Sequence, residues 1–137
     1  MIVADTNIIS YLFLPTIYSD KTSQLYRIDP DWAAPELWRS EFRNVLALYL
    51  RQNILSLTEA LALQDEAESL MADREFILPS VAVMNLVASS TCSAYDCEFV
   101  ALARQLSVKL VTQDKKLLKE FPETALSLDE FIFRASS

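Results

Sequence analysis

Short apolar segments alternate with amphipathic helical stretches along the whole chain, and this alternation constrains the fold more than any other feature. Buried strands are predicted at residues 1–4, 32–34, 76–78, 108–112 and 125–128. Helices are predicted at residues 8–13, 21–28, 36–50, 58–73, 80–87, 95–106, 114–121 and 129–134. Strands that alternate with helices form a mostly parallel central sheet with helices on both faces. The sequence therefore predicts an α/β fold.

The chain has the length of one ordinary domain, 137 residues. No repeat, low-complexity tract or linker divides it, so we predict a single domain over residues 1–137. Two absent residue types exclude classes of chemistry, because the chain has no glycine and no histidine. Without glycine there is neither a dinucleotide fingerprint nor a P-loop. Without histidine there is no Ser-His-Asp or Cys-His catalysis and no histidine–zinc site.

The charge balance is acidic, with a formal net charge of −7. Nucleic-acid binding normally uses a basic surface, so this charge argues against non-specific binding to nucleic acid. The objection weakens if several acids are committed to a metal ion. An enzyme built from this sequence would rely on carboxylates and hydroxyls, most readily with a hard cation.

Cysteine usage and the N-terminus indicate the cellular compartment. Cys92 and Cys97 are the only cysteines, and two thiols without histidine cannot complete a four-ligand zinc site. We expect reduced thiols in a cytoplasmic protein. No basic segment precedes the N-terminal apolar stretch, and no apolar run approaches the ~18 residues that cross a bilayer. We therefore expect neither a signal peptide nor a membrane span.

Two acids follow predicted strands. Asp5 comes directly after the first strand and Asp114 after the strand at 108–112. In parallel sheets ligands bind beyond the carboxyl ends of the strands, so the two carboxylates are expected at one edge. A helix N-cap is the alternative explanation for each acid taken alone.

Glu41 lies in an apolar stripe of the predicted helix 36–50. Its neighbours at helical spacing are all apolar: Leu37, Trp38, Val45 and Leu48. The carboxylate is therefore expected to face the core, where an unpaired charge costs several kcal/mol. Its partner is a cation, a set of hydrogen bonds or an arginine, which would be Arg39, Arg43 or another arginine of the chain.

Asp96 repeats this pattern near the start of the helix 95–106. Phe99, Val100 and Ala103 follow it at helical spacing, so its carboxylate is also directed inward. The alternative is a capping box in which Ser93 is the N-cap.

Oxygen-rich sites of this kind suit Mg²⁺ or Mn²⁺. Four acids at one edge repel each other, and a divalent cation reverses that interaction. The cation also acidifies water and neutralises phosphoryl charge, as phosphodiester hydrolysis requires. Asn7, two residues after Asp5, and Thr112, two before Asp114, are predicted to orient a ligand or a water. Turn or cap hydrogen bonds are the alternative for both.

Four motifs stand in a fixed order along the chain. They are VADTN at 3–7, LWRSEFRNVL at 37–46, AYD at 94–96 and VTQD at 111–114. Together they resemble the PIN domain, and most closely the VapC-like toxin ribonucleases of bacterial type II toxin–antitoxin pairs. The resemblance covers almost the whole chain; no motif is specific alone, but the ordered set is.

The resemblance implies a three-layer α/β/α fold and a Mg²⁺- or Mn²⁺-dependent endoribonuclease in which metal-activated water attacks an RNA phosphodiester. By match, the acidic quartet corresponds to Asp5, Glu41, Asp96 and Asp114, and the hydroxyl residue before the last acid to Thr112. It also implies a homodimer and a small antitoxin that blocks the site with a basic side chain. A non-catalytic PIN-like module that binds RNA or protein is the alternative.

Two residues depart from the family pattern. Ser107 stands where a glycine is expected between a helix and a strand, and serine tolerates a left-handed C-cap less well. Cys97 directly follows Asp96, which predicts activity that is sensitive to oxidation.

Candidate RNA contacts flank the acids. Phosphate contacts are predicted for Arg39, Arg43, Lys115, Lys116 and Lys119, with a solvated helix face as the alternative. Base stacking is considered for Tyr11, Tyr18, Tyr26 and Trp32, with core or dimer packing as the alternative.

Overall fold

A five-stranded parallel sheet organises the computed structural model, which describes residues 1–136. The strands are β1 (Ile2–Ala4), β2 (Trp32–Pro35), β3 (Glu75–Phe76), β4 (Leu110–Val111) and β5 (Ala125–Leu126). Their order is β3-β2-β1-β4-β5, and every neighbouring pair is parallel. The first strand of the sequence is thus the central strand of the sheet, with β2 and β4 on either side.

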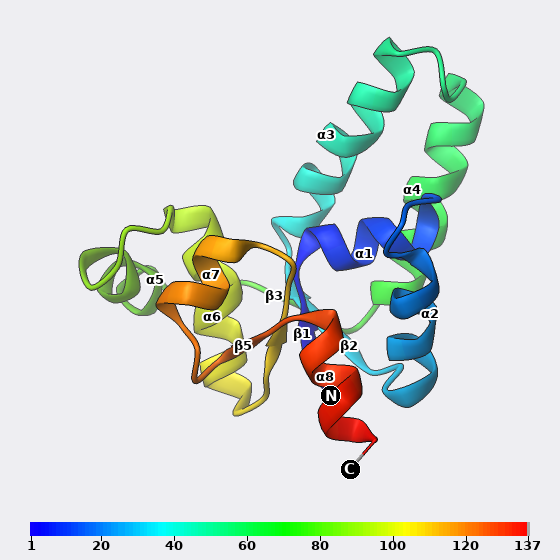
Figure 1. The fold of residues 1–137 in the computed structure, drawn as a ribbon. Helices are drawn as coiled ribbons and strands as arrows, with labels where there is room; N and C mark the ends of the chain where they lie inside the picture. The colour runs from blue at the N-terminus through cyan, green and yellow to red at the C-terminus, as the bar shows by residue number, and fades with distance from the viewer. Residues whose placement is uncertain (137) are drawn as a thin grey trace.

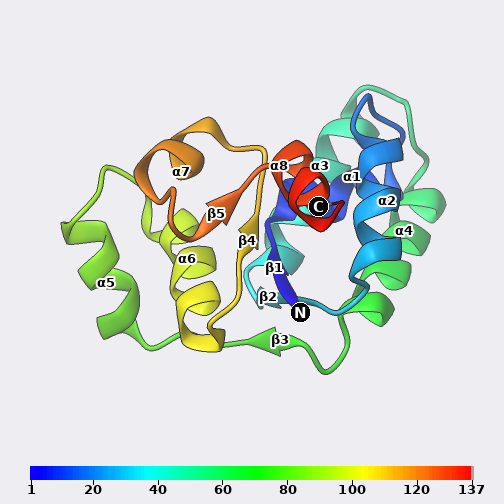
Figure 2. The same ribbon diagram turned by 60° about the horizontal axis from the view of Figure 1, so that its bottom comes forward.

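Helices cover both faces of this sheet (Figures 1 and 2). They are α1 (Thr6–Phe13), α2 (Ser19–Ile28), α3 (Trp38–Arg51), α4 (Leu57–Met71), α5 (Ser80–Ala88), α6 (Ala94–Leu106), α7 (Lys115–Glu120) and α8 (Leu128–Ala135). Helices α5, α6 and α7 lie on one side of the sheet, and α1, α2, α4 and α8 on the other. The expected α/β/α sandwich is confirmed, and each predicted helix and strand has a counterpart. The strand predicted as buried at 76–78 is the exception in detail: β3 covers only Glu75–Phe76 and is half-buried, and Ile77 lies outside it and is exposed.

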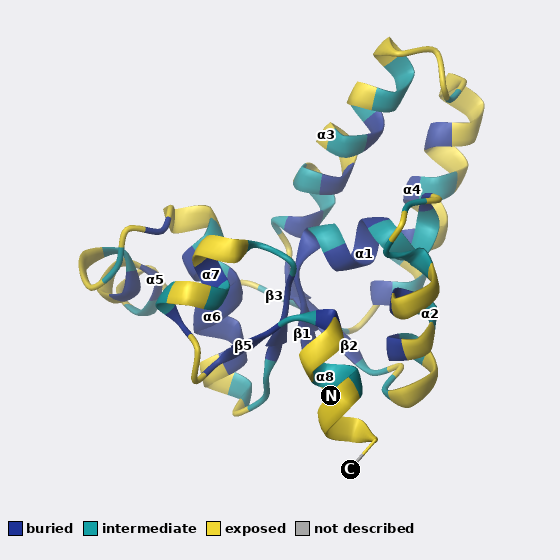
Figure 3. Ribbon diagram, viewed as in Figure 1, coloured by how far each residue is buried: buried dark blue, intermediate teal, exposed yellow. Residues whose placement is uncertain are grey.

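The core lies along the sheet, because each central strand is buried on both faces. Every residue of β1 and β2 is buried. Apolar strands without alternation are typical of parallel sheets covered by helices. The buried strands form the dark centre of Figure 3, whereas the outer ends of α3 and α4 are largely exposed. Among residues 1–136, no helix is long and apolar enough to cross a membrane.

Helices α3 and α4 project from the body as a hairpin arm (Figure 1). The buried residues of α3 are Trp38, Phe42 and Leu46. The face of α3 that carries Glu41 was expected to be buried, but the buried face is rotated from it by part of a turn. Leu48, at the far end of the expected face, is 51% exposed. Core packing selects the aromatic side of the helix, so the Glu41 side is left to border a cleft.

Arg39 fastens the base of this arm. Its Nε and Nη2 atoms donate to the two carboxylate oxygens of Glu75 on β3, at 2.6 and 2.7 Å. Its Nη1 donates to Glu68 on α4 at 3.0 Å, and Trp38 Nε1 donates to Glu75 at 2.8 Å. The expected phosphate contact by Arg39 is thus corrected, because its guanidinium is occupied by two carboxylates.

Ser107 ends α6 in the left-handed conformation, with φ 56° and ψ 42°. A Cβ atom makes this conformation unfavourable by roughly 1–2 kcal/mol, whereas glycine adopts it freely. Ser107→Gly is therefore expected to raise the free energy of unfolding by about 1 kcal/mol, measured by urea denaturation. Ser136→Gly, at a right-handed C-cap (φ −84°), is the matched control and should bring no gain. Equal effects of the two substitutions would contradict the assignment of strain to Ser107.

Candidate active site

A cleft of about 590 Å³ opens where β1 and β4 end. The four acids singled out from the sequence all line it: Asp5, Glu41, Asp96 and Asp114. The remaining lining residues are Thr6, Asn7, Leu37, Ser40, Asn44, Val45 and Tyr95. Side chains separated by more than a hundred positions therefore meet in one concave site.

Asp5 is the buried centre of the site, and only 8% of it is exposed. Pairing of β1 with β4 sets Ala4 beside Val111, and the Asp5 N–H donates to the Val111 carbonyl at 3.1 Å. The hydroxyl of Thr112 then donates to Asp5 Oδ2 at 2.6 Å. The Thr6 N–H donates to Asp5 Oδ1 at 2.8 Å, so both oxygens of the carboxylate are held in place.

Thr112 also connects this centre to Asp114. Its Oγ1 accepts a hydrogen bond from the Asp114 N–H at 3.0 Å while donating to Asp5. Thr112 is fully buried, so its hydroxyl has one fixed role in linking the two acidic positions. The turn hydrogen bond considered as the alternative for Thr112 is present, and the same hydroxyl holds Asp5. Orientation of a ligand or a water by Thr112 stays a prediction.

Glu41 reaches the same site from α3. Its Oε1 accepts a hydrogen bond from the Thr6 hydroxyl at 2.7 Å. Neither candidate arginine is its partner: Arg39 binds Glu68 and Glu75, and exposed Arg43 contacts Ser40 at 3.5 Å. Glu41 is half-buried in the cleft wall, not in the core.

Asp96 and Asp114 each occupy a helix N-terminus as well as the cleft. The Asp96 N–H donates to the hydroxyl of Ser93, the N-cap of α6, at 3.1 Å. Asp114 caps α7 through Oδ1, which accepts from the Lys116 and Leu117 N–H groups. Capping uses one oxygen of Asp114, and within residues 1–136 Oδ2 accepts no hydrogen bond. The capping and ligand interpretations are therefore compatible.

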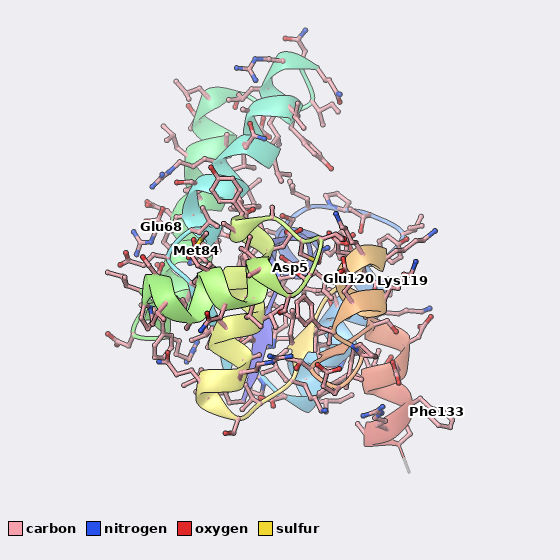
Figure 4. All side chains as sticks on the ribbon, turned by 90° about the vertical axis from the view of Figure 1, so that its left-hand side faces the viewer. Asp5, Glu68, Met84, Lys119, Glu120 and Phe133 are labelled. Carbon is pink, nitrogen blue, oxygen red and sulfur yellow. The ribbon has the colours of Figure 1, made fainter. Side chains whose placement is uncertain are left out.

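A carboxylate on α7 ties these two helices together. Glu120 accepts from the Thr91 N–H at 2.8 Å, from the Thr91 hydroxyl at 2.5 Å and from the Cys92 thiol at 3.4 Å. Thr91 and Cys92 belong to the loop that leads into α6. Figure 4 shows Glu120 and Lys119 on α7 and Asp5 in the interior of the molecule. The contact fixes the loop before Asp96 against the helix that begins after Asp114.

Burial and mutual repulsion raise the pKa values of three of these acids. Desolvation raises the pKa of Asp5 to about 7, although the hydrogen bonds from Thr112 and Thr6 oppose the shift. Desolvation is also the largest cause of the raised pKa values of Glu41 and Asp96. The charge of Asp96 adds to the shift at Glu41, and that of Asp114 to the shift at Asp96. The site thus concentrates negative charge that its surroundings neutralise only in part, since the charge of Lys116 opposes the shift at Asp96, whose pKa is still raised.

The donor set suits a hard divalent cation. The polar lining groups offer oxygen ligands, and no Lys or Arg among residues 1–136 lines the cleft. Asn7 Oδ1 is buried without a hydrogen-bond partner among the described residues, which leaves an acceptor available to a ligand. In residues 1–136 no group of three or more Asp, Glu or Cys side chains is placed so that it could hold a metal ion by itself. Mg²⁺ is commonly held by one or two carboxylates with water and phosphate completing its shell, so an open site of this kind fits it.

The predicted RNA contacts divide into two groups. Lys115, Lys116 and Lys119 are exposed on α7. The charge of Lys116 partly opposes the rise in the pKa of Asp96, which places Lys116 near the acids. The aromatic candidates pack within the protein instead. The ring centroids of Tyr11 and Tyr18 are 4.8 Å apart, and those of Tyr26 and fully buried Trp32 are 5.5 Å apart. None of these four lines the cleft, so the packing alternative holds for them.

Sequence reasoning missed several residues of the cleft wall. Thr6, Ser40, Asn44 and Tyr95 all line it. Each is within three positions of a predicted acid, so a search of the turn around each carboxylate would have found them.

The predicted oxidation sensitivity of Cys97 is not supported, because the thiol is fully buried and burial raises its pKa, which suppresses the reactive thiolate.

A parallel α/β sheet of order β3-β2-β1-β4-β5 with an acidic cleft at its carboxyl edge defines the class of this protein. Comparison of the sequence with protein families identifies the family. The PIN domain family model matches residues 2–123, and the chain belongs to the PIN domain family, a family of nucleases. No curated protein sequence matches the chain.

Solved structures share the fold at low sequence identity. PAE2754 from Pyrobaculum aerophilum superposes with a TM-score of 0.75 at 18% identity, covering 98% of this chain and 88% of that one. FitAcB from Neisseria gonorrhoeae gives 0.69 at 21% identity, covering 93% and 98%. FitAB bound to an IR36 DNA fragment gives 0.68 at 19% identity, covering 93% and 95%.

Proposed function

We propose that this protein is a Mg²⁺- or Mn²⁺-dependent endoribonuclease. The observation that carries the proposal is the meeting of Asp5, Glu41, Asp96 and Asp114 in one cleft, which no Lys or Arg of the described residues lines. Carboxylates gathered in one cleft repel each other, and a divalent cation removes that repulsion. Membership of the PIN family supports nuclease chemistry in this position.

The side chains of the cleft have distinct roles in this proposal. Asp5, Glu41, Asp96 and Asp114 would hold the metal, and a bound divalent cation supplies an acidified water and neutralises phosphoryl charge. Thr112 and Thr6 position Asp5 through hydrogen bonds to its two oxygens. The Thr6 hydroxyl also positions Glu41. Asn7 would offer its unpaired Oδ1 to a ligand or a water.

Cleavage of RNA by wild type and by Asp96→Asn tests the proposal. Wild type is expected to cut RNA only when Mg²⁺ or Mn²⁺ is present, and the variant to lose at least ~100-fold in rate because it loses a charged oxygen ligand. Calorimetry should show Mn²⁺ binding to wild type that weakens in the variant. Asp65→Asn, on the exposed side of α4, is the matched control and should behave as wild type.

Two outcomes would contradict the nuclease. Metal binding without cleavage of any RNA would favour the non-catalytic module that binds RNA or protein. A protein that binds no divalent cation would remove the metal-dependent mechanism altogether.

The cellular role we propose is that of a cytoplasmic toxin held in check by a cognate antitoxin. The four ordered motifs resemble VapC-like toxins, and this resemblance also favours a homodimer. The similar FitAB structure is bound to DNA. With a net charge of −7, this chain would need a partner protein to supply any such contact. A neighbouring reading frame for a small DNA-binding protein, and loss of cleavage when that protein is added, would support this role.

A further inference from the structure

Two threonines connect three of the four acids of the cleft. Thr112 donates to Asp5 and accepts a hydrogen bond from the Asp114 N–H. Thr6 donates to Asp5 through its N–H and to Glu41 through its hydroxyl. These three acids therefore share one hydrogen-bonded frame, and the fourth acid is left to be placed by its own helix.

Asp96, the fourth acid, lies in the first turn of α6, ahead of the part of this helix that the core holds. The buried residues of α6 begin at Cys97, and Tyr95 is exposed. The Asp96 N–H donates to Ser93, the last residue of the loop at 89–93. The position of this carboxylate therefore depends on how the loop is held.

Glu120 of α7 holds the loop at 89–93 (Figure 4). Its Oε1 accepts from the Thr91 N–H at 2.8 Å, and its Oε2 accepts from the Thr91 hydroxyl at 2.5 Å. The Cys92 thiol also donates to Oε2, at 3.4 Å. Among the described residues, the other hydrogen bonds of this loop all stay within residues 85–97. Glu120 is thus the contact that ties the loop to another part of the fold.

Helix α7 connects this contact to the acidic cleft, because Asp114 is its N-cap and Glu120 its last residue. A helix of six residues is about 9 Å long, and its backbone hydrogen bonds keep that length constant. We propose that Glu120 is a positioning residue that sets the separation of Asp96 and Asp114, and thereby makes the cleft prefer Mg²⁺ to Ca²⁺. The proposal rests on the proposed metal-dependent nuclease and names the cation that the same site selects.

The two cations differ in size and in the geometry that they require. Mg²⁺ takes a near-ideal octahedron of oxygens at about 2.0–2.1 Å, whereas Ca²⁺ accepts flexible arrangements at about 2.3–2.6 Å. Acids that cannot move apart therefore favour the smaller ion. Both ions carry the same charge, so an additional negative charge attracts both and does not separate them. A contact that fixes the distance between two ligands can separate them.

Calorimetric titration of the metal-free protein with Mg²⁺ and with Ca²⁺ tests the proposal. Glu120→Ala releases the loop, so the ratio of Mg²⁺ to Ca²⁺ affinity is expected to fall roughly 10-fold, the lower end of what loss of a contact behind a metal ligand costs. Glu120→Gln removes the same charge but keeps an oxygen acceptor for Thr91. It should weaken the binding of both ions by the same factor and leave their ratio unchanged.

The matched control is Glu123→Ala, which also removes an acidic contact to α6. Glu123 accepts from Arg104 at 2.8 Å, and Arg104 lies in the last turn of α6, far along the helix from Asp96. This variant should keep the wild-type ratio of the two affinities. A fall in the ratio equal to that of Glu120→Ala would contradict a specific role of the Glu120 contact.

Hydrogen exchange in the metal-free protein gives a second readout, which does not depend on activity. In Glu120→Ala the Thr91 N–H loses its acceptor and should exchange faster. The Asp96 N–H should also exchange faster, because the loop that carries its partner Ser93 is released. Faster exchange at Thr91 alone, with an unchanged preference for Mg²⁺, would show a purely local role and overturn the proposal.

The outcomes separate this proposal from the nuclease itself. If Glu120→Ala does not fold, Thr91→Val decides in its place, since it removes one donor to Glu120 from an exposed position and should lower the same ratio. Metal-dependent cleavage with an unchanged ratio in the folded variant would overturn the positioning role and leave the nuclease standing. The expected ratios without cleavage of any RNA would do the reverse. A wild-type protein that binds neither cation would overturn both.

Discussion

Replacing Asp5 by asparagine is expected to abolish metal-dependent cleavage and, at the same time, to make the metal-free protein more stable at neutral pH. Asp5 is buried and its pKa is raised from 3.8 to about 7, chiefly by desolvation. The ionised carboxylate therefore destabilises the fold unless a cation binds. Asparagine keeps the shape and an oxygen acceptor for the Thr6 N–H, but it carries no charge.

The pH dependence of this effect has a definite sign. A carboxyl group that binds its proton more tightly in the folded state stabilises the protein fully below pH ~4, and that contribution is lost as the pH rises through about 7. The shift corresponds to roughly 4 kcal/mol at most. Asp5→Asn has no such titration, so its stability relative to wild type should increase between pH 4 and pH 8. We expect a net advantage of about 2 kcal/mol at pH 8, because the Thr112 donor loses its charged acceptor.

Urea denaturation at several pH values, with and without Mg²⁺, measures both parts of this prediction. Wild type should gain stability on addition of metal, since a ligand that binds only the folded state stabilises it. Asp5→Asn should not respond, and its cleavage rate should fall by at least ~100-fold. Asp65→Asn should follow wild type throughout. A variant that is less stable than wild type at pH 8 without metal would show that Asp5 is chiefly a structural residue.

The strand-to-helix junctions explain why much of the site could be predicted from the sequence. Asp5 directly follows β1 and Asp114 comes three residues after the end of β4, and parallel strands end at one edge. The order of strands and helices was therefore enough to predict where these two acids lie. The sequence could not decide between a helix cap and a ligand for each of them, because the two oxygens of one carboxylate can serve both purposes. In Asp114 one of them caps α7 and the other has no partner among the described residues.

The helix α3 shows where sequence reasoning fails. A stripe of apolar residues marks one face of a helix, but it does not tell whether that face meets the core or a cleft. Leu37 and Val45 line the cleft with Glu41, whereas Trp38 and Phe42 enter the core. Likewise, Arg39 stands two positions before Glu41, yet residues two apart on a helix face different sides. Its partner Glu75 lies 36 positions away, on a strand of two residues.

Arg39→Ala is expected to cost about 2 kcal/mol of the free energy of unfolding, because it leaves two carboxylates without their counter-ion. Of the two carboxylates, Glu75 is expected to contribute more to this loss of stability. Its side chain is only 11% exposed and accepts hydrogen bonds from both Arg39 and Trp38. The loss is smaller than for a fully buried pair because the Arg39 side chain is 38% exposed. Arg39 also lowers the pKa of Glu75, so its stabilising effect is present above pH ~4.5 and is lost as the pH falls further.

The same substitution should make the position of Glu41 in the acidic cleft less well defined, since the first turn of α3 carries both Arg39 and Glu41. We expect weaker Mn²⁺ binding in Arg39→Ala, measured by calorimetry under conditions where the variant is folded. Arg43→Ala removes an exposed arginine four positions further on and should leave both stability and metal affinity unchanged. In Arg39→Met with Glu75→Gln the uncompensated Glu75 charge is absent, so most of the lost stability should return. If this double variant is as unstable as the sum of the two single variants, the ion pair is not what fastens the arm to β3.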